Sequence, residues 1–306
     1  MNILSPQRPI SPSAARLRHL SLLTLLLLLV GCGSQPVLPM PSSGVGFEMR
    51  VRYTGEMSPE QQAEFERAAQ RWSQVVVGDL HDTFVEANHV ERYCNGYSYG
   101  GVIDDLLLFA GIEDLDGPGG VVGMAGACIL RADGFPLVGM VLIDSSDVDN
   151  LSSTGDMYTV VLHELGHVLD LSQAGWQRRD LLDYDRAECM ESFTVEFTGD
   201  SANEQYSRLG GSGPVPVENN AVPGTACSHW DFETFHNELM TGYLTSDARL
   251  SRLTVGALAD MGYQVDMSAA DSYSLDPDAV RPLSVGRPVN ERLLPPPVTL
   301  DELGEP

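Results

Sequence analysis

The segment that most constrains the fold is a His-Glu-x-x-His motif formed by His163, Glu164 and His167. Residues four apart share one face of a helix, so both imidazoles can bind one Zn²⁺ while Glu164 addresses the water that the metal activates. Bound zinc lowers the pKa of that water to about 7, which lets a nearby carboxylate accept its proton at neutral pH. The segment also carries an apolar stripe for packing against a core: Val161, Leu165 and Val168. The sequence therefore predicts a zinc-binding helix.

The ends of this helix are predicted from its flanking residues. Ser153 and Asp156 have the spacing of a capping box, in which side chains bond the free N–H groups of a first helical turn. We therefore expect one helix from about Ser153 to about Leu171.

The sequence around the motif predicts an α+β fold. Strand-like segments, with alternating or short apolar runs, are residues 47–53, 106–110, 121–124 and 138–143. Predicted helices are residues 58–77, which Ser58 and Pro59 begin, an acidic piece at 183–195, and residues 250–261, which Gly262 ends.

A catalytic zinc site needs a third protein ligand, because such sites hold three and leave the fourth position to water. The histidines outside the leader and the motif are His81, His89, His229 and His236. His229 has the most informative setting, since Trp230 follows it directly and Met240 follows eleven residues later.

Taken together, these elements resemble the leishmanolysin family of metzincin zinc proteases. That family combines the His-Glu-x-x-His motif, a third histidine displaced by a long insertion and often followed by Trp, and then Glu-Leu-Met. The same order stands here, with sixty-one residues between His167 and His229 and with Glu238-Leu239-Met240 after them. The likeness covers most of residues 65–265 and includes Arg71-Trp72, Gly78-Asp79-Leu80, Asp104-Asp105-Leu106 through Gly119, and Leu258-Ala259-Asp260-Met261-Gly262-Tyr263.

The resemblance implies a metzincin-like domain with a twisted sheet, a zinc-binding helix and a smaller C-terminal subdomain. It implies that His229 is the third zinc ligand, that Met240 lies in a turn beneath the metal, and that Glu164 is the base in peptide-bond hydrolysis. The substrate would be a protein or peptide. Tyr243, three residues after Met240, is a candidate hydrogen-bond donor to the developing oxyanion.

One residue departs from the family pattern, and one alternative ligand scheme stays open. The family usually has Gly three residues after the second motif histidine, where this chain has Asp170. Asp tolerates left-handed backbone better than most residues, so the turn is expected to form.

A thermolysin-like site would take Glu191 or Glu188, in place of His229, as the third ligand, but this scheme leaves the Glu-Leu-Met turn unexplained.

The amino terminus is typical of an exported protein. Three arginines precede an apolar stretch at residues 20–30, which is too short to span a bilayer and fits a signal peptide. The segment ending at Cys32 resembles a bacterial lipobox, which implies cleavage and lipidation of Cys32; an ordinary secretion signal is the alternative. Gly33 after the cysteine implies sorting to the outer membrane of a double-membraned bacterium.

Four cysteines remain beyond Cys32, namely Cys94, Cys128, Cys189 and Cys227. They are widely spaced and contain no CxxC pair, which in an oxidising compartment favours two disulfides over a metal site. The spacing leaves three pairings open, and buried free thiols are the alternative.

The predicted organisation is a signal peptide (1–31), a lipidated Cys32 with a flexible tether (32–46), a protease domain (47–265) and a disordered Pro-rich tail (266–306). The net charge of −25 argues against nucleic acid as a partner. The sequence thus predicts a zinc endopeptidase attached to the envelope membrane through lipid. A non-catalytic zinc-binding envelope lipoprotein is the alternative from another class.

Overall fold

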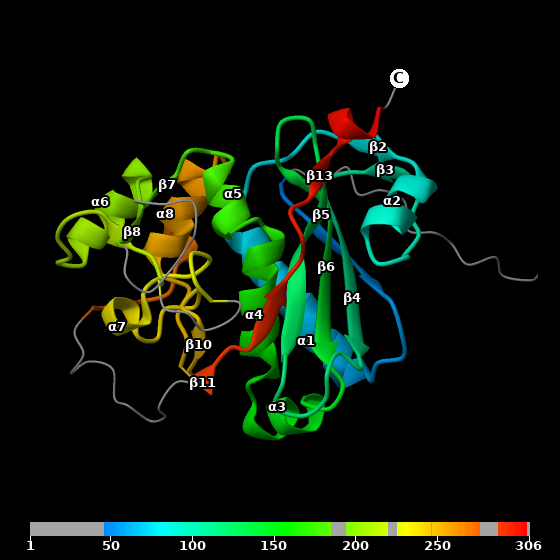
Figure 1. The fold of residues 1–306 in the computed structure, drawn as a ribbon, viewed down its shortest axis with the longest axis horizontal. Helices are drawn as coiled ribbons and strands as arrows, with labels where there is room; N and C mark the ends of the chain where they lie inside the picture. The colour runs from blue at the N-terminus through cyan, green and yellow to red at the C-terminus, as the bar shows by residue number, and fades with distance from the viewer. Residues whose placement is uncertain (1–45, 185–193, 220–224, 246, 276–286, 305–306) are drawn as a thin grey trace, which may run out of the picture. The chain divides into compact units, whose positions relative to one another are not determined.

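A six-stranded sheet forms the centre of the fold (Figure 1). The computed structural model describes residues 46–184, 194–219, 225–245, 247–275 and 287–304. β1 (Met49–Tyr53), β4 (Leu106–Glu113) and β6 (Pro136–Asp144) are parallel neighbours in that order. β5 (Gly123–Leu130) is antiparallel to β6, and its other side pairs in parallel with β12 (Glu291–Leu293) and β13 (Val298–Thr299). The predicted mixed α and β composition is confirmed.

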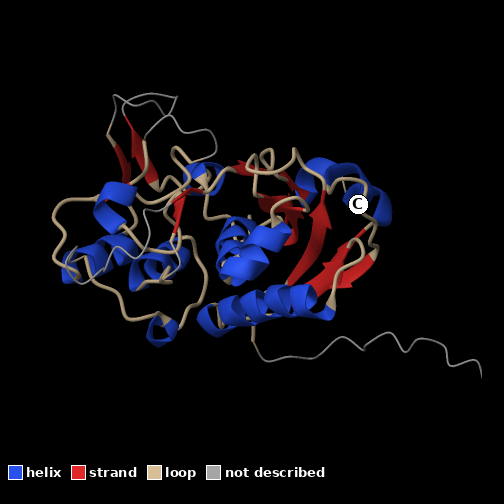
Figure 2. Cartoon of the chain, turned by 90° about the horizontal axis from the view of Figure 1, so that it is seen from below, coloured by secondary structure: helices blue, strands red, loops and turns tan. Residues whose placement is uncertain are grey.

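The two faces of the sheet belong to two hydrophobic clusters, because successive strand residues point to opposite sides. On β4, Leu106 and Leu108 join the larger cluster, whereas Leu107 and Phe109 join the smaller one. The larger cluster contains the buried faces of α1 (Pro59–Val75) and α4 (Met157–Val168), which lie beside the sheet in both views (Figures 1 and 2). The smaller cluster includes residues from α2 (Ala87–Tyr93), β2 (Thr83–Val85) and β3 (Gly101–Ile103).

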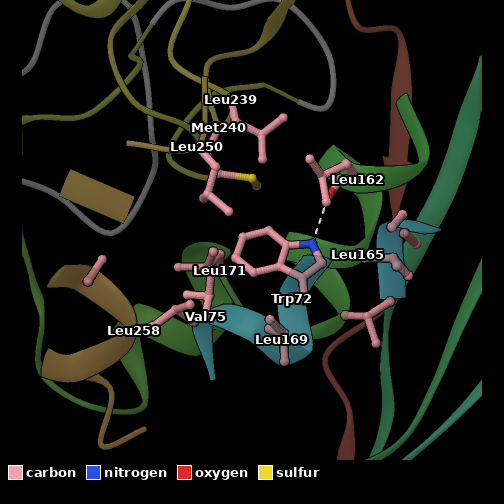
Figure 3. Packing of buried hydrophobic residues seen from close by; sticks show 14 of the residues in the cluster. Trp72, Val75, Leu162, Leu165, Leu169, Leu171, Leu239, Met240, Leu250 and Leu258 are labelled. Atoms are coloured by element: carbon pink, nitrogen blue, oxygen red, sulfur yellow. Dashed lines mark hydrogen bonds between the residues drawn. The ribbon is translucent and has the colours of Figure 1, made fainter. Parts of the chain in front are cut away.

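Helix α1 begins where the sequence predicts and packs against α4, the helix predicted to bind zinc. The Ser58 side chain accepts a hydrogen bond from the Gln61 N–H, and the Gln61 side chain accepts one from the Ser58 N–H. Farther along, the Trp72 indole N–H donates to the Leu162 carbonyl at 2.9 Å (Figure 3). Since Trp72 is fully buried, this bond fixes α1 against the turn that precedes His163.

The start predicted for the zinc helix is wrong. Ser153 lies in the last turn of a separate helix, α3 (Val148–Thr154), where its hydroxyl donates to the Asn150 carbonyl. Gly155 then takes a left-handed conformation (φ 80°), which ends α3, and α4 starts after Asp156 without a side-chain cap. The Ser153–Asp156 spacing therefore marks a break between two helices.

The chain after α4 forms smaller elements around a group of aromatic rings. Trp176 stacks on Trp230 with ring centroids 5.0 Å apart, and Phe197 packs edge-on against both. This packing fixes the segment in which His229 precedes Trp230. The elements here are α5 (Gln173–Gln177), β7 (Leu182–Tyr184), β8 (Val195–Phe197), α6 (Asp200–Arg208), β9 (Val215–Pro216), α7 (Phe232–Phe235), β10 (Tyr243–Leu244), α8 (Arg252–Asp260) and the 3₁₀ turn η1 (Met267–Ala269).

Of the two helices predicted in this region, one is confirmed and the other is not. Helix α8 confirms the predicted helix at 250–261, and Gly262 follows it with φ 100°. The expected helical piece at 183–195 instead has a strand at each end, β7 and β8, which pair antiparallel. Residues 185–193 between them lie outside the described residues.

A disulfide joins Cys94 to Cys128, whose Cα atoms are 5.5 Å apart. It links α2 to β5, and both sulfurs lie in the smaller hydrophobic cluster. Cys227 is disulfide-bonded as well, while Cys189 falls outside the described residues. The prediction of disulfide-bonded cysteines is thus confirmed for the Cys94–Cys128 pair.

The carboxyl-terminal segment differs from the expected disordered tail. Residues 287–304 form β11 (Arg287–Pro288), β12, β13 and the 3₁₀ turn η2 (Leu300–Leu303), drawn in red in Figure 1. β11 pairs antiparallel with β10, and the later strands pair with β5. Leu300 is buried against the smaller cluster. Pairing with strands distant in sequence orders the segment, and its polar, Pro-rich composition gives no local sign of this.

The described residues all lie within one compact unit, Ser43–Pro306. No helix among them has both the length and the apolar character that crossing a membrane requires. Residues 1–45, with the predicted signal peptide and Cys32, fall outside the described part of the chain.

Candidate metal centre

Three buried histidines bring their Nε2 atoms to one point. His163 and His167 lie one turn apart on α4, and His229 comes from the segment before Trp230. The Nε2 atom of His167 is 3.2 Å from that of His163 and 3.1 Å from that of His229, and the third separation is 3.2 Å. All three rings are at least 98% buried. The structure thus joins the motif pair to the histidine expected from the sequence.

The other nitrogen of each ring donates to a backbone carbonyl. His163 Nδ1 donates to the Leu239 carbonyl at 2.7 Å, and His167 Nδ1 donates to the Leu171 carbonyl at 2.6 Å. His229 Nδ1 donates in the same way to Thr225, at 2.8 Å. A carbonyl can only accept, so each Nδ1 carries a proton, and in the neutral ring each Nε2 presents a lone pair. Such bonds fix the tautomer and the orientation of metal-binding histidines.

This arrangement fits a zinc ion. Three lone pairs that converge at 3.1–3.2 Å repel one another unless a proton or a metal ion is shared between them. Zinc binds imidazole nitrogens at 2.0–2.1 Å in tetrahedral geometry, which separates neighbouring nitrogens by about 3.3–3.4 Å. The observed spacing is therefore close to that of a tetrahedral His₃ site.

Glu164 lies beside this cluster and is fully buried. Neither of its carboxylate oxygens has a hydrogen-bond partner within the described residues. A Cβ atom at Gly123 would lie 2.2 Å from Glu164 Oε1, so the absence of a side chain there makes room for the carboxylate against β5. In the metal-free chain, burial and then the neighbouring Glu291 carboxylate raise the pKa of Glu164 well above its usual range.

Met240 packs directly under the zinc helix. A Cβ atom at Gly166 would lie 2.6 Å from the Met240 sulfur, so Gly166 permits this approach. In Figure 3, Met240 points toward Trp72 beside Leu250. Glu238 holds the turn in place, because its buried carboxylate accepts from the Met240 N–H at 2.6 Å and from Ser251 and Thr254 at the start of α8. The Glu-Leu-Met segment therefore forms a braced turn below His163.

Asp170 preserves the turn that ends the helix. It adopts the left-handed conformation expected from the sequence, with φ 75°. Its N–H bonds the His167 carbonyl, and the next N–H, of Leu171, bonds the Gly166 carbonyl, which together form a Schellman motif. The buried Asp170 carboxylate pairs with Arg178 at 2.5 Å and with Arg179 at 2.7 Å. Two arginines thus neutralise the carboxylate charge of Asp170, which the glycine usual in the family would not carry.

Glu291, from β12, is the residue at this centre that the sequence does not reveal. Its Oε1 lies 2.8 Å from His229 Nε2, and its Oε2 lies 3.1 Å from His163 Nε2 and 3.4 Å from His167 Nε2. Burial alone would raise the pKa of the Glu291 carboxyl, but the three histidines hold it well below its usual range in the metal-free chain. The residues next to Glu291 in the sequence form no metal-binding motif. Only the pairing of β12 with the distant strand β5 could have indicated that Glu291 lies at this centre.

The remaining candidates have different surroundings. The ring of Tyr243 stacks on Phe232, with centroids 4.2 Å apart, and its role as an oxyanion donor stays a prediction. Glu188 and Glu191, the alternative ligands, lie outside the described residues. His229 is the third histidine of the cluster, next to the motif pair His163 and His167.

A cavity of about 260 Å³ lies beside the amino-terminal half of α4. Val160, one turn before His163 on α4, lines it together with Val122 and Leu151, and Pro288 to Asn290 close it from the carboxyl-terminal segment.

Comparison with known proteins agrees with this geometry. The chain is 28% identical over 162 residues to the ciliated left-right organizer metallopeptidase of Xenopus laevis, a match that covers 47% of this chain and 22% of that protein. It is 30% identical over 176 residues to leishmanolysin of Leishmania donovani, covering 55% of this chain and 28% of that protein. The matched region thus spans less than a third of these relatives. Residues 67–275, more than half of the chain, match the leishmanolysin family model, and the chain therefore belongs to the leishmanolysin family of metallopeptidases.

Proposed function

We propose that this chain is a zinc-dependent endopeptidase of the metzincin type. The observation that carries the proposal is the convergence of three Nε2 lone pairs, from His163, His167 and His229, beside the buried carboxylate of Glu164. Family membership supports the same reaction class.

In this proposal the three histidines would hold zinc, which would supply Lewis acidity toward water and toward the scissile carbonyl. Glu164 accepts the proton of the attacking water on its carboxylate and passes it to the leaving amine. Gly123 leaves space for this carboxylate, and the carbonyls of Leu239 and Leu171 keep the imidazoles oriented. Met240 supports the helix from below, and Tyr243 stays a candidate oxyanion donor.

The substrate would be an extended protein or peptide chain. On the side away from β6, β5 pairs with β12 and β13 in this structure; with these strands displaced, its backbone N–H and C=O groups next to Glu164 could pair with an added substrate strand. The cavity beside Val160 would be open to a substrate side chain once Pro288 to Asn290, which close it in this structure, move away.

The test measures zinc content and peptide-library digestion together. The variants are made in a Glu291→Ala background, because Glu291 stands where substrate must approach. Digestion should stop on chelation and return when zinc is added. His163→Ala should lose both zinc and digestion, whereas Glu204→Gln, a change at an exposed helix residue, should keep both. Digestion that persists in the chelated protein would refute the proposal.

One observation favours a second function, a non-catalytic zinc-binding protein. Structural zinc sites have four protein ligands, and Glu291 with the three histidines makes four. In that case the Glu291→Ala protein would bind zinc without digesting any peptide.

For its location, we propose that lipidated Cys32 anchors the chain to the outer membrane of a double-membraned bacterium. The support is the lipobox-like sequence that ends the short apolar stretch. Secretion without an anchor is the alternative.

A further inference from the structure

The carboxyl-terminal segment, residues 287–304, lies where a substrate peptide would have to bind. Glu291, Arg292 and Leu293 of β12 pair with Gly123, Met124 and Ala125 of β5. The Val122 N–H also donates to the Asn290 carbonyl at 2.6 Å, and the Leu294 N–H donates to the Ala125 carbonyl at 2.9 Å. Without this segment β5 would be the edge of the sheet, because β6 covers its other side.

The segment is held at both ends. Before Glu291, β11 pairs with β10, and the buried Val289 donates its N–H to the Gly242 carbonyl at 3.0 Å. After Glu291, β13 continues along β5, and Leu300 packs into the smaller hydrophobic cluster. The segment therefore crosses from the Met240 side of the metal centre to the far end of β5, and Glu291 lies between the two attachments.

The Glu291 side chain is what reaches the metal centre. Its two oxygens lie 2.8–3.4 Å from the three Nε2 atoms, the range expected between neighbouring ligands of one ion. It would take the fourth position, which a catalytic zinc site leaves to water or substrate. A side-chain carboxylate there presents no peptide carbonyl to Glu164, so the segment fills the site without offering a bond for cleavage.

We infer that residues 287–304 are an intramolecular inhibitor, which pairs with β5 in place of substrate and closes the metal site with Glu291. This inference rests on the proposed peptidase function. It means that the chain is latent in the conformation described, and that activity requires the segment to leave β5 or Glu291 to leave the metal.

The test compares the full-length chain with Glu291→Ala and with Arg292→Ala as matched control. Arg292 is the next residue on β12, and its exposed side chain is on the opposite side of the strand. Cobalt-substituted protein reports the ligand set through its visible absorption, and transfer of zinc to a chromophoric chelator reports the rate at which the site releases the metal. Peptide hydrolysis is measured on the same zinc-loaded samples. Glu291→Gln, which keeps the side-chain shape, replaces the alanine variant should that one fail to fold.

We expect Glu291→Ala to change the cobalt spectrum, to release zinc at least about 10-fold faster, and to hydrolyse peptide at least about 10-fold faster than wild type. The substitution removes one ligand, opens the fourth metal position and takes away one of the contacts that hold the segment in place. Arg292→Ala should match wild type in all three. A synthetic peptide of residues 287–304 should inhibit Glu291→Ala more strongly than the same peptide with alanine at the Glu291 position.

Unchanged spectrum and zinc release in Glu291→Ala would overturn the inference, whatever the activity. A changed spectrum together with measurable wild-type hydrolysis, at a rate equal to or above that of Glu291→Ala, would also overturn it, since Glu291 would be a ligand without being an inhibitor. Failure of the proposed function looks different: the spectrum changes but no variant hydrolyses peptide, and the inhibitory role then falls with the peptidase.

Discussion

Replacing Asp170 tests whether its two arginine partners are essential to the turn after the zinc helix. Asp170 is 3% exposed, left-handed, and paired with Arg178 and Arg179. Breaking a buried ion pair costs about 3–5 kcal/mol, and we take the lower end because the Arg178 side chain is 30% exposed. Left-handed backbone costs a residue other than glycine about 1 kcal/mol.

These magnitudes give an order for three variants. Asp170→Gly loses the ion pairs but gains backbone freedom, so it should lower the free energy of unfolding by about 2 kcal/mol. Asp170→Asn keeps the tolerance for left-handed backbone and should cost about 3 kcal/mol, and Asp170→Ala should cost about 4 kcal/mol. Asp180, also left-handed at φ 54° but exposed, is the matched control. Asp180→Gly should change the free energy of unfolding by no more than about 1 kcal/mol.

The assay is urea unfolding followed by tryptophan fluorescence. All samples are stripped of zinc, because bound metal adds to the free energy of unfolding. If Asp170→Gly is as stable as wild type, the ion pairs contribute nothing, and Asp170 is only a tolerated substitute for the family glycine.

Three other predictions concern the ligand set, acid stability and anchoring. His229→Ala should lower zinc affinity at least about 10-fold and Glu191→Ala should not, as measured by chelator competition; the reverse would favour the thermolysin-like scheme. Although burial alone would raise the pKa of Asp144, four backbone N–H groups lower it to about 2. Asp144→Asn should therefore cost about 2 kcal/mol of unfolding free energy above pH 4, and the difference from wild type should vanish as pH falls through 2; a difference that does not depend on pH would contradict this. Cys32→Ser should move the protein out of the membrane fraction, and wild-type protein that fractionates as soluble without lipid would refute the anchor.

Local sequence signals identified most of the metal centre. His163, His167 and Glu164 are predicted by spacing on one helix, which needs no knowledge of the fold. His229 is 62 residues farther along the chain than His167, and the Trp and Glu-Leu-Met segments that follow it gave its place through a family resemblance. The structure brings these histidines together as expected.

Features that depend on distant pairing were not predicted. Glu291 follows His167 by more than a hundred residues, in a segment whose composition indicates disorder, and only pairing with β5 brings it to the histidines. The break at Gly155 was missed for a different reason: the Ser153–Asp156 pattern fits a capping box, and sequence alone does not distinguish a helix start from the junction between two helices.

The most direct test of the proposed mechanism is peptide hydrolysis by two zinc-loaded proteins, Glu291→Ala and the double variant that adds Glu164→Gln. Glu164 lies beside the cluster but is not in the group of side chains that could hold the metal, so both proteins should bind zinc equally. Loss of the base should lower the rate of hydrolysis in the double variant by about 10²–10⁴-fold. Equal zinc content with equal hydrolysis rates would contradict the assignment of Glu164 as the base, and with it the proposed mechanism.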